Sequence, residues 1–317
     1  MIDFLGIGAQ KSGTTWLMKN LKRHPDVWTP RRIKEVHYFD LLYPCEHNEF
    51  RLNEYKRRVR LLIKNFKRDP NIWIPKRTRA LYYLNMLFLS HSKAARLGKF
   101  QRRIEKYYDP AKRELSEQEG EYFSRHLDPG FAFTDEWYAH TFGASTGKVK
   151  GEFTPSYCAI GEEGVAHVRR LMPDVKLIYM VRDPYERAMS SLRMLMGRDP
   201  IRKRTPEDYA RNPVFARKGD YANNIPVWEA AFNAGQILYI PFGRVKSDPL
   251  GVLREVEAHL GLEPFDNYLA ITDKVNATGK KKLAIHEDVS DQIRSMTEPQ
   301  YPFLAERFGE DFLTAIR

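Results

Sequence analysis

Cysteine and long apolar runs are scarce in this sequence. Only two of its 317 residues, Cys45 and Cys158, are cysteine, which argues against the disulfide framework of small secreted domains. The longest apolar region, about residues 81–89, is too short to cross a bilayer and is interrupted by Asn85. No positively charged segment followed by an apolar stretch opens the chain, so we expect no secretory signal, no transmembrane segment and a cytoplasmic location.

Internal repeats, low-complexity segments and clusters of metal ligands are also lacking. Apolar residues make up 42% of the chain, which is enough to bury a sizeable core. We therefore expect one α/β domain over residues 1–317, with a helical insertion at about residues 44–147 and no metal site.

The N-terminal stretch organises the rest of the chain. Residues 4–8 form an apolar run that predicts a strand, and residues 16–21 carry apolar side chains at helical spacing. The turn between them is made of small residues and one lysine, Lys11. Gly8 and Gly13 let the backbone approach an anion closely, and the unpaired N–H groups at a helix start point toward such a ligand. The stretch therefore predicts a phosphate-binding loop.

The position of the lysine distinguishes this loop from a Walker A motif. In G-x-x-x-x-G-K-[ST] the lysine directly follows the second glycine, whereas Lys11 stands two residues before Gly13. The order argues against a P-loop-like nucleotide kinase that uses ATP and Mg²⁺, which remains an alternative. A second alternative, which holds for any isolated glycine-rich loop, is a plain turn with no ligand.

A second segment, residues 34–40, carries two groups that can transfer protons. If it is extended, Glu35 and His37 project to the same side, because alternate residues of a strand share a face. The alternative is an ordinary edge segment with a solvated Glu35 and a hydrogen-bonded His37.

A strand and a helix start predict a second anion site. Residues 176–181 form a continuous apolar run, which suits a buried parallel strand. Arg182 follows this strand directly, and Pro184 favours a helix start that places Ser190 about two turns into the helix. In open α/β sheets, ligands lie at the carboxyl ends of the strands.

Further strands are expected at residues 27–29, 149–157 and 237–241, with helices between them. Together these patterns predict a P-loop-like parallel sheet flanked by helices. A basic glycine loop follows at residues 276–282, which as an isolated feature reads as a surface turn.

The net charge of +11 is concentrated in one region. Residues 51–113 contain 19 Lys and Arg against four Asp and Glu, a net charge of +15. Such a field attracts anionic molecules or surfaces, although a solvated helix face has the same composition.

Four of these features occur together and in order: the Lys11 loop, the segment at residues 34–40, the strand with Arg182 and Ser190, and the strand and helix that end at Gly261. In this order they resemble the sulfotransferases that use 3′-phosphoadenosine 5′-phosphosulfate (PAPS), most closely the branch that sulfates heparan sulfate and other carbohydrates. The resemblance covers the sheet and its loops but not the basic insertion.

The resemblance implies a role for each motif. The loop would hold the 5′-phosphosulfate of PAPS through Lys11, Ser12, Gly13, Thr14, Thr15 and Trp16. Arg182 and Ser190 would hold the 3′-phosphate, because an arginine supplies paired donors to phosphate oxygens. The late loop with Gly279, Lys280 and Lys281 would close over the cofactor. Glu35 aligns with the catalytic base of the carbohydrate branch, and His37 is the second candidate.

One departure concerns the third strand. Several carbohydrate sulfotransferases have a lysine after the glutamate of this strand, whereas here Glu152 is followed by Phe153.

The implied reaction is direct in-line transfer of the sulfuryl group to a hydroxyl or amine, with PAP as product. Glu35 would remove the acceptor's proton while Lys11 stabilises charge on the leaving group. The acceptor is expected to be a saccharide or another small alcohol, with an acidic saccharide or a lipid favoured by the basic insertion, and no nucleic-acid partner is expected. A non-catalytic basic protein that binds polyanions remains the other alternative.

Overall fold

The computed structural model describes residues 1–30, 35–43, 131, 134–143, 148–198, 205–211, 213–268 and 285–317. Most of the predicted insertion and the loop with Gly279, Lys280 and Lys281 lie outside these ranges. The chain divides into two compact units. One comprises Met1–Thr29, Glu35–Cys45 and Ser145–Arg317, and the other comprises Pro30–Lys34 and Glu46–Ala144. The features described below belong to the first unit, except helix α7 (Asp135–His140).

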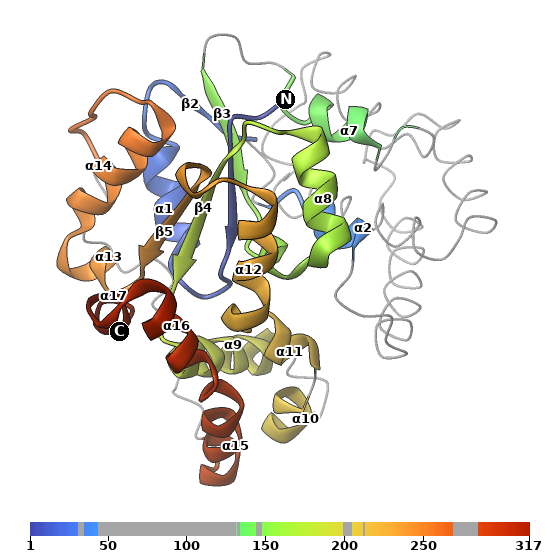
Figure 1. The fold of residues 1–317 in the computed structure, drawn as a ribbon, viewed down its shortest axis with the longest axis vertical. Coiled ribbons are helices and arrows are strands. Elements are labelled where there is room, and N and C mark those ends of the chain that lie inside the picture. Colours follow the sequence, from blue (N-terminus) through green and yellow to red (C-terminus); the bar gives the residue numbers. More distant parts are fainter. Residues whose placement is uncertain are drawn as a thin grey trace, which may run out of the picture. The chain divides into compact units, whose positions relative to one another are not determined.

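The first unit is built on a parallel sheet of five strands in the order β2-β3-β1-β4-β5 (Figure 1). Its strands are β1 (Phe4–Gly8), β2 (Val27–Trp28), β3 (Val149–Phe153), β4 (Lys176–Val181) and β5 (Ile237–Pro241). All four neighbouring pairs are parallel, so every strand has its carboxyl end at the same edge. The prediction of a parallel α/β sheet is therefore confirmed.

Helices connect the strands and extend the chain at its end. The α-helices of the first unit are α1 (Thr14–Leu21), α2 (Phe39–Leu42), α8 (Gly161–Leu171), α9 (Pro184–Arg198), α10 (Pro206–Ala210), α11 (Pro213–Arg217), α12 (Tyr221–Ala231), α13 (Arg244–Ser247), α14 (Pro249–Leu260), α15 (Glu287–Thr297), α16 (Gln300–Phe308) and α17 (Glu310–Ala315). The described residues also form two short 3₁₀ helices, η1 (Tyr157–Ala159) and η2 (Ala234–Gln236).

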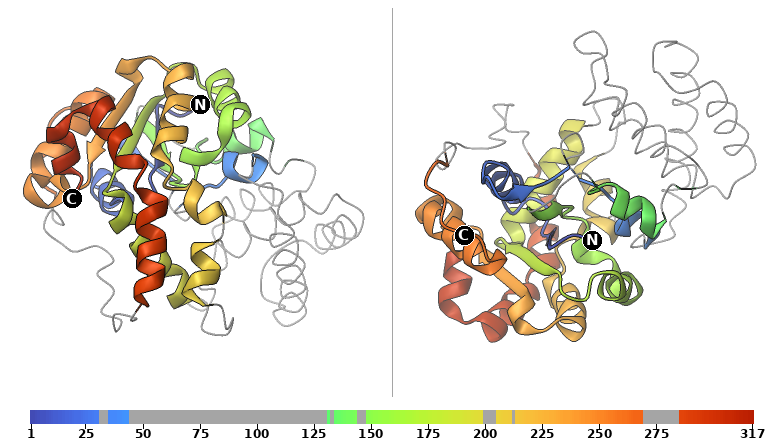
Figure 2. Two further views of the ribbon diagram at one scale, coloured as in Figure 1. Left: turned by 60° about the horizontal axis from the view of Figure 1, so that its bottom comes forward. Right: turned by 90° about the horizontal axis from the view of Figure 1, so that it is seen from above.

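Both faces of the sheet are covered, which explains why β1 and β4, from Leu177 on, are apolar rather than alternating. Helices α1 and α14 lie on one face, and α8 and α12 lie on the other (Figures 1 and 2). On the first face, Leu17 and Val256 pack with Ile178 of β4 in one buried cluster. On the second, Tyr179 of β4 contacts Tyr221 of α12.

A smaller core lies at the carboxyl edge. Helix α9 leaves the end of β4 there, and α15 packs beside it (Figure 2). Leu192 of α9 and Ile293 of α15 are buried together in this cluster. The packing fixes α9, which begins two residues after Arg182.

Local sequence signals explain where α14 begins and ends. The Asp248 side chain accepts a hydrogen bond from the Gly251 N–H at 3.0 Å, and Pro249 occupies the first turn. At the other end Gly261 adopts the left-handed conformation, with φ 69°. None of the helices in the described ranges has the length and apolar character needed to cross a membrane.

Candidate active site

The loop after β1 leaves the carboxyl edge of the central strand. Gly13 has φ 90° and ends the loop as the N-cap of α1, a conformation that favours glycine. No side chain caps this helix, and the N–H groups of Gly13, Thr14 and Thr15 donate no backbone hydrogen bond to the described residues. These amides, with the positive end of the helix dipole, form a place where an anion can bind.

The six predicted loop residues differ in exposure. The side chains of Ser12, Thr14 and Trp16 are buried, and Trp16 packs into the core beneath α1. Lys11, Gly13 and Thr15 are partly exposed. A ligand at this loop would therefore meet Lys11, Thr15 and the backbone rather than the other side chains.

Arg182 lies against the Lys11 loop. Its Nη1 donates a hydrogen bond to the carbonyl oxygen of Lys11 at 3.1 Å, and its guanidinium carbon lies 4.7 Å from the ring centroid of Phe242. Burial lowers the pKa of Arg182 from its usual value, and Glu186, 3.6 Å away, counteracts that effect. The two predicted anion-binding groups are thus brought together, and Ser190 lies half-buried on α9.

Glu35, His37 and Asp40 form a linear series of contacts. His37 Nε2 lies 2.9 Å from Glu35 Oε2, and His37 Nδ1 lies 2.6 Å from Asp40 Oδ2. The three side chains are 27%, 12% and 13% exposed. Since each contact needs a proton and a neutral ring carries only one, either the ring donates at both nitrogens or one of the two carboxyl groups donates its own proton to the ring. A carboxylate held in this way can exchange a proton with a bound hydroxyl.

The backbone at this segment is not the extended strand considered above. His37 has φ 55°, so the chain turns there, and α2 begins two residues later. The predicted pairing of Glu35 with His37 is present, but a turn produces it. Lys11 (φ 74°) and His37 are the only non-glycine residues with positive φ in the ranges the structure describes. Such conformations cost energy and cluster at functional sites.

The family model described as "Sulfotransferase family" matches residues 4–267. The chain belongs to this family.

Curated relatives include two mouse proteins of the family. Heparan sulfate glucosamine 3-O-sulfotransferase 3B1 of Mus musculus is 31% identical over 166 residues, which cover 49% of this chain and 40% of the relative. Heparan sulfate glucosamine 3-O-sulfotransferase 6 of Mus musculus is 30% identical over 167 residues, covering 49% of this chain and 45% of that protein. The match therefore spans less than half the length of each relative.

Solved structures share the fold. A sulfotransferase from Alicyclobacillus acidocaldarius has a TM-score of 0.59 at 18% identity, and the match covers 100% of this chain and 99% of that one. A sulfotransferase domain from the curacin biosynthetic pathway has a TM-score of 0.50 at 15% identity, covering 96% of this chain and 98% of the other.

In this sulfotransferase-family chain, β3 anchors the Glu35 segment. Three consecutive amides bind side chains at or after the end of β3. Val36 N–H donates to Glu152 Oε2 (3.1 Å), His37 N–H to Thr154 Oγ1 (3.4 Å) and Tyr38 N–H to the Tyr157 hydroxyl (2.9 Å). These bonds tie a segment with little regular structure of its own to the edge of the sheet.

Glu152 joins these anchors. Its side chain is buried and accepts hydrogen bonds from Thr154 Oγ1 at 2.6 Å and from the Tyr157 hydroxyl at 2.9 Å. Burial and the nearby charge of Glu152 raise the pKa of Tyr157. Phe153, which stands where several carbohydrate sulfotransferases have a lysine, packs on Phe4 in the core with ring centroids 5.9 Å apart.

Sequence reasoning missed several of these residues. Asp40 was available as a carboxylate three residues after His37, but its contact with the ring depends on a turn that periodicity does not reveal. Glu152, Thr154 and Tyr157 are more than 115 residues from the amides they bind. No local pattern could have identified these pairs.

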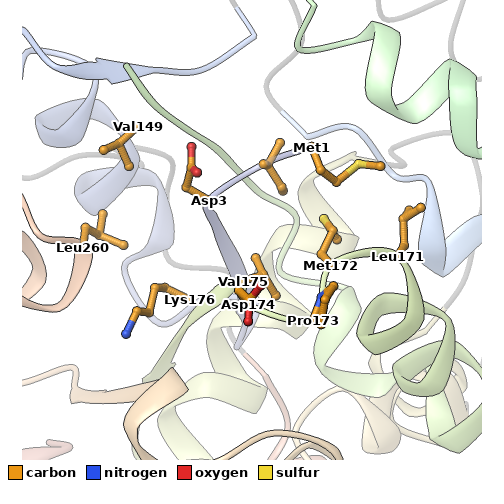
Figure 3. A pocket seen from close by; sticks show the side chains of 11 residues that line it. Met1, Asp3, Val149, Leu171, Met172, Pro173, Asp174, Val175, Lys176 and Leu260 are labelled. Carbon is orange, nitrogen blue, oxygen red and sulfur yellow. The ribbon is translucent and has the colours of Figure 1, made fainter. Parts of the chain in front are cut away.

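A cavity of about 420 Å³ lies elsewhere, at the amino ends of the strands (Figure 3). Asp3 precedes β1, and Pro173 and Lys176 lie at the start of β4. The cavity is thus at the sheet edge opposite Lys11, Glu35 and Arg182, and none of the predicted site residues that the structure describes lines it.

Proposed function

We propose that this chain is a PAPS-dependent sulfotransferase that transfers the sulfuryl group directly to a hydroxyl or amine. The observation that carries the proposal is the Glu35–His37–Asp40 series at the same sheet edge as the Lys11 loop. A phosphate-type loop alone would suit many nucleotide enzymes. The combination of this loop with an oriented carboxylate, and with Arg182 in contact with the loop, suits group transfer from a nucleotide that carries phosphates on both the 3′ and the 5′ positions of its ribose.

The residues of the edge fit the phosphate groups of PAPS. Lys11 and the unbonded amides of Gly13, Thr14 and Thr15 would hold the 5′ end and stabilise negative charge on the leaving phosphate. Arg182, with Ser190 on the following helix, would hold the 3′-phosphate. We further propose that the loop of Gly279, Lys280 and Lys281, which lies outside the described residues, completes this site. When bound, PAPS supplies the sulfuryl group and departs as PAP.

The Glu35–His37–Asp40 series would accept the proton that the acceptor loses. Glu35 accepts the proton of the acceptor as the acceptor oxygen or nitrogen bonds to sulfur and the bond from sulfur to the 5′-phosphate oxygen breaks. His37 holds the Glu35 carboxylate, and Asp40 holds the His37 ring. Because the ring lies between two carboxylates, we assign it an orienting role and Glu35 the role of base.

We propose an acidic saccharide as the acceptor. The names of the curated relatives describe 3-O-sulfotransferases of heparan sulfate glucosamine. The net charge of +15 over residues 51–113, outside the described ranges, would attract such a polyanion. We also propose that residues 44–147 are an insertion within one catalytic domain.

A ligand comparison tests the proposal. A ligand that binds the native state raises its apparent melting temperature, so we expect a clear shift with PAP and none with ATP and Mg²⁺. Incubation with radiolabelled PAPS and a panel of saccharides should then label an acceptor. A shift with ATP and Mg²⁺ but not with PAP would instead favour a nucleotide kinase. A shift with heparin alone would favour a polyanion-binding protein.

A further inference from the structure

Arg187 is a buried cation with no counter-ion among the described residues. Its side chain is 1% exposed, and Nε and Nη1 are buried without a hydrogen-bond partner among the described residues. None of the acidic side chains in those ranges forms an ion pair with it, and Asp183, one turn earlier, is engaged by Glu186 N–H and the Tyr301 hydroxyl. A charge buried in this way is expensive, and arginine keeps its charge in proteins.

The guanidinium of Arg187 lies directly on Gly219, in the turn between α11 and α12. A Cβ atom at Gly219 would lie 2.0 Å from Nη2 and 2.4 Å from Cζ of Arg187. The neighbouring Lys218 donates from Nζ to Ser156 Oγ at 3.2 Å. The absence of a side chain at residue 219 therefore makes room for the cation.

The charge of Arg187 acts on the Arg182 site. It contributes to lowering the pKa of Arg182, for which burial is the main cause, and it opposes the rise that burial imposes on the pKa of Tyr221. The Tyr221 hydroxyl accepts from Arg182 N–H at 3.2 Å and donates to Arg182 C=O at 3.0 Å. Two cations thus share the low-dielectric region at the end of β4, with Tyr221 near both.

We propose that Arg187 is a further residue of the anion site, whose charge is left uncompensated so that it favours a doubly charged phosphate bound at Arg182. The inference rests on the proposed function, in which that phosphate is the 3′-phosphate of PAPS. Arg187 acts through the electrostatic field rather than by contact, because most of its guanidinium is inaccessible. An electrostatic interaction of this kind is strong in a region that excludes water.

The proposal predicts that the charge lowers the stability of the ligand-free protein and raises its affinity for the ligand. Arg187→Met keeps the approximate size and removes the charge, so its melting temperature without ligand should equal or exceed that of the wild type. Its dissociation constant for PAP should rise by about tenfold or more, equivalent to ~1.4 kcal/mol. Its affinity for adenosine 5′-phosphate, which lacks the 3′-phosphate, should be unchanged.

Two further variants separate charge from shape. Arg187→Lys restores a cation and should recover most of the PAP affinity. Gly219→Ala places a methyl group where the guanidinium lies, so it should weaken PAP binding while Arg187 itself is retained. Isothermal titration calorimetry and thermal unfolding, with and without PAP or adenosine 5′-phosphate, provide all the readouts.

The outcomes distinguish this inference from the proposed function. If the wild type binds PAP and Arg187→Met binds it with the same affinity, the inference is overturned while the proposed function stands. A lower melting temperature of Arg187→Met with equal losses for both nucleotides would also overturn it, because it would indicate a structural role. If the wild type does not bind PAP, the PAPS assignment fails, and titration with inorganic phosphate then tests the inference. Thermal stabilisation by phosphate in the wild type but not in Arg187→Met would support the anion site. No such stabilisation would overturn the inference.

Discussion

Arg182 and Lys11 are joined by a hydrogen bond of 3.1 Å between Nη1 of the arginine and the carbonyl oxygen of the lysine, 171 residues apart in sequence. The contact links the loop after β1 to the end of β4. It fixes the guanidinium beside the loop, where burial also restricts it. We therefore expect the two proposed anion-binding groups to act on different parts of one ligand.

The first prediction follows from this contact. Arg182→Ala should weaken binding of PAP by about 1.5–3 kcal/mol, because a charged partner is lost. Binding of adenosine 5′-phosphosulfate, which lacks the 3′-phosphate, should change much less. Calorimetric titration of both ligands measures the difference, with Arg307→Ala, whose guanidinium binds Glu229 at the surface, as a control. Equal losses for the two ligands would contradict the assignment.

The second prediction separates chemistry from binding at the Glu35 series. Glu35→Gln keeps the shape and removes the base, so turnover should fall by roughly 10²–10⁴ with PAP affinity little changed. Asp40→Asn should lower turnover less, because Glu35 remains and only the hold on His37 Nδ1 weakens. Lys11→Ala should reduce both turnover and PAP affinity. Normal turnover in Glu35→Gln together with an inactive His37→Ala would assign the base to His37.

The third prediction tests the anchoring of this segment to β3. Tyr157→Phe removes the donor to Glu152 and the acceptor for Tyr38 N–H, so the free energy of unfolding should fall by about 1–3 kcal/mol. Turnover should fall as well, with PAP affinity retained. Tyr239→Phe is the matched control, because it removes a similar bond to Glu229 at 3.0 Å far along the sheet. Equal effects of the two variants on turnover would show that the anchor has no role in positioning Glu35.

The fourth prediction concerns pH. Burial, followed by the positive charge of Lys176, lowers the pKa of His259 below its usual 6.5, and its Nε2 lies 3.2 Å from the Leu177 carbonyl oxygen. Below pH 6.5 His259 takes up a proton in the unfolded chain but not yet in the folded chain. The contribution of neutral His259 to the free energy of unfolding is therefore fully present above pH 6.5 and is lost as the pH falls through the folded-state pKa. Urea unfolding from pH 8 to 5 should show a shallower decline in His259→Gln than in the wild type. Parallel declines would contradict the assignment.

The fifth prediction concerns the basic insertion, outside the described residues. Replacing Arg57, Arg58, Lys64 and Lys67 by glutamine should raise the KM for an acidic saccharide and flatten its dependence on salt, because such attraction is screened over ~8 Å at physiological ionic strength. PAP affinity should be unchanged. Steady-state kinetics at several salt concentrations provide the measurement. A KM that responds neither to salt nor to the four substitutions would assign these residues to a solvated helix face.

The sequence by itself predicted the strands of the sheet and placed Lys11 and Arg182 just after two of them. Continuous apolar runs at residues 4–8 and 176–181 predicted β1 and β4 with their observed bounds. Pro184 marked the start of α9, whereas the helix expected at residues 16–21 begins two residues earlier, at Thr14. These features depend on residues a few positions apart, so local conformational preference and hydrophobic periodicity were enough to find them.

Only the tertiary structure decided which polar groups meet. The turn at His37 that brings Asp40 to its ring is held by Glu152 of β3 and by Thr154 and Tyr157, which follow that strand, all more than 115 residues later in the chain. The burial of Arg187 Nε and Nη1 without a hydrogen-bond partner in the described part of the chain is likewise a property of the folded interior. Hydrogen-bond partners and burial depend on which distant segments pack together, and a sequence pattern records only what each residue prefers near its own neighbours.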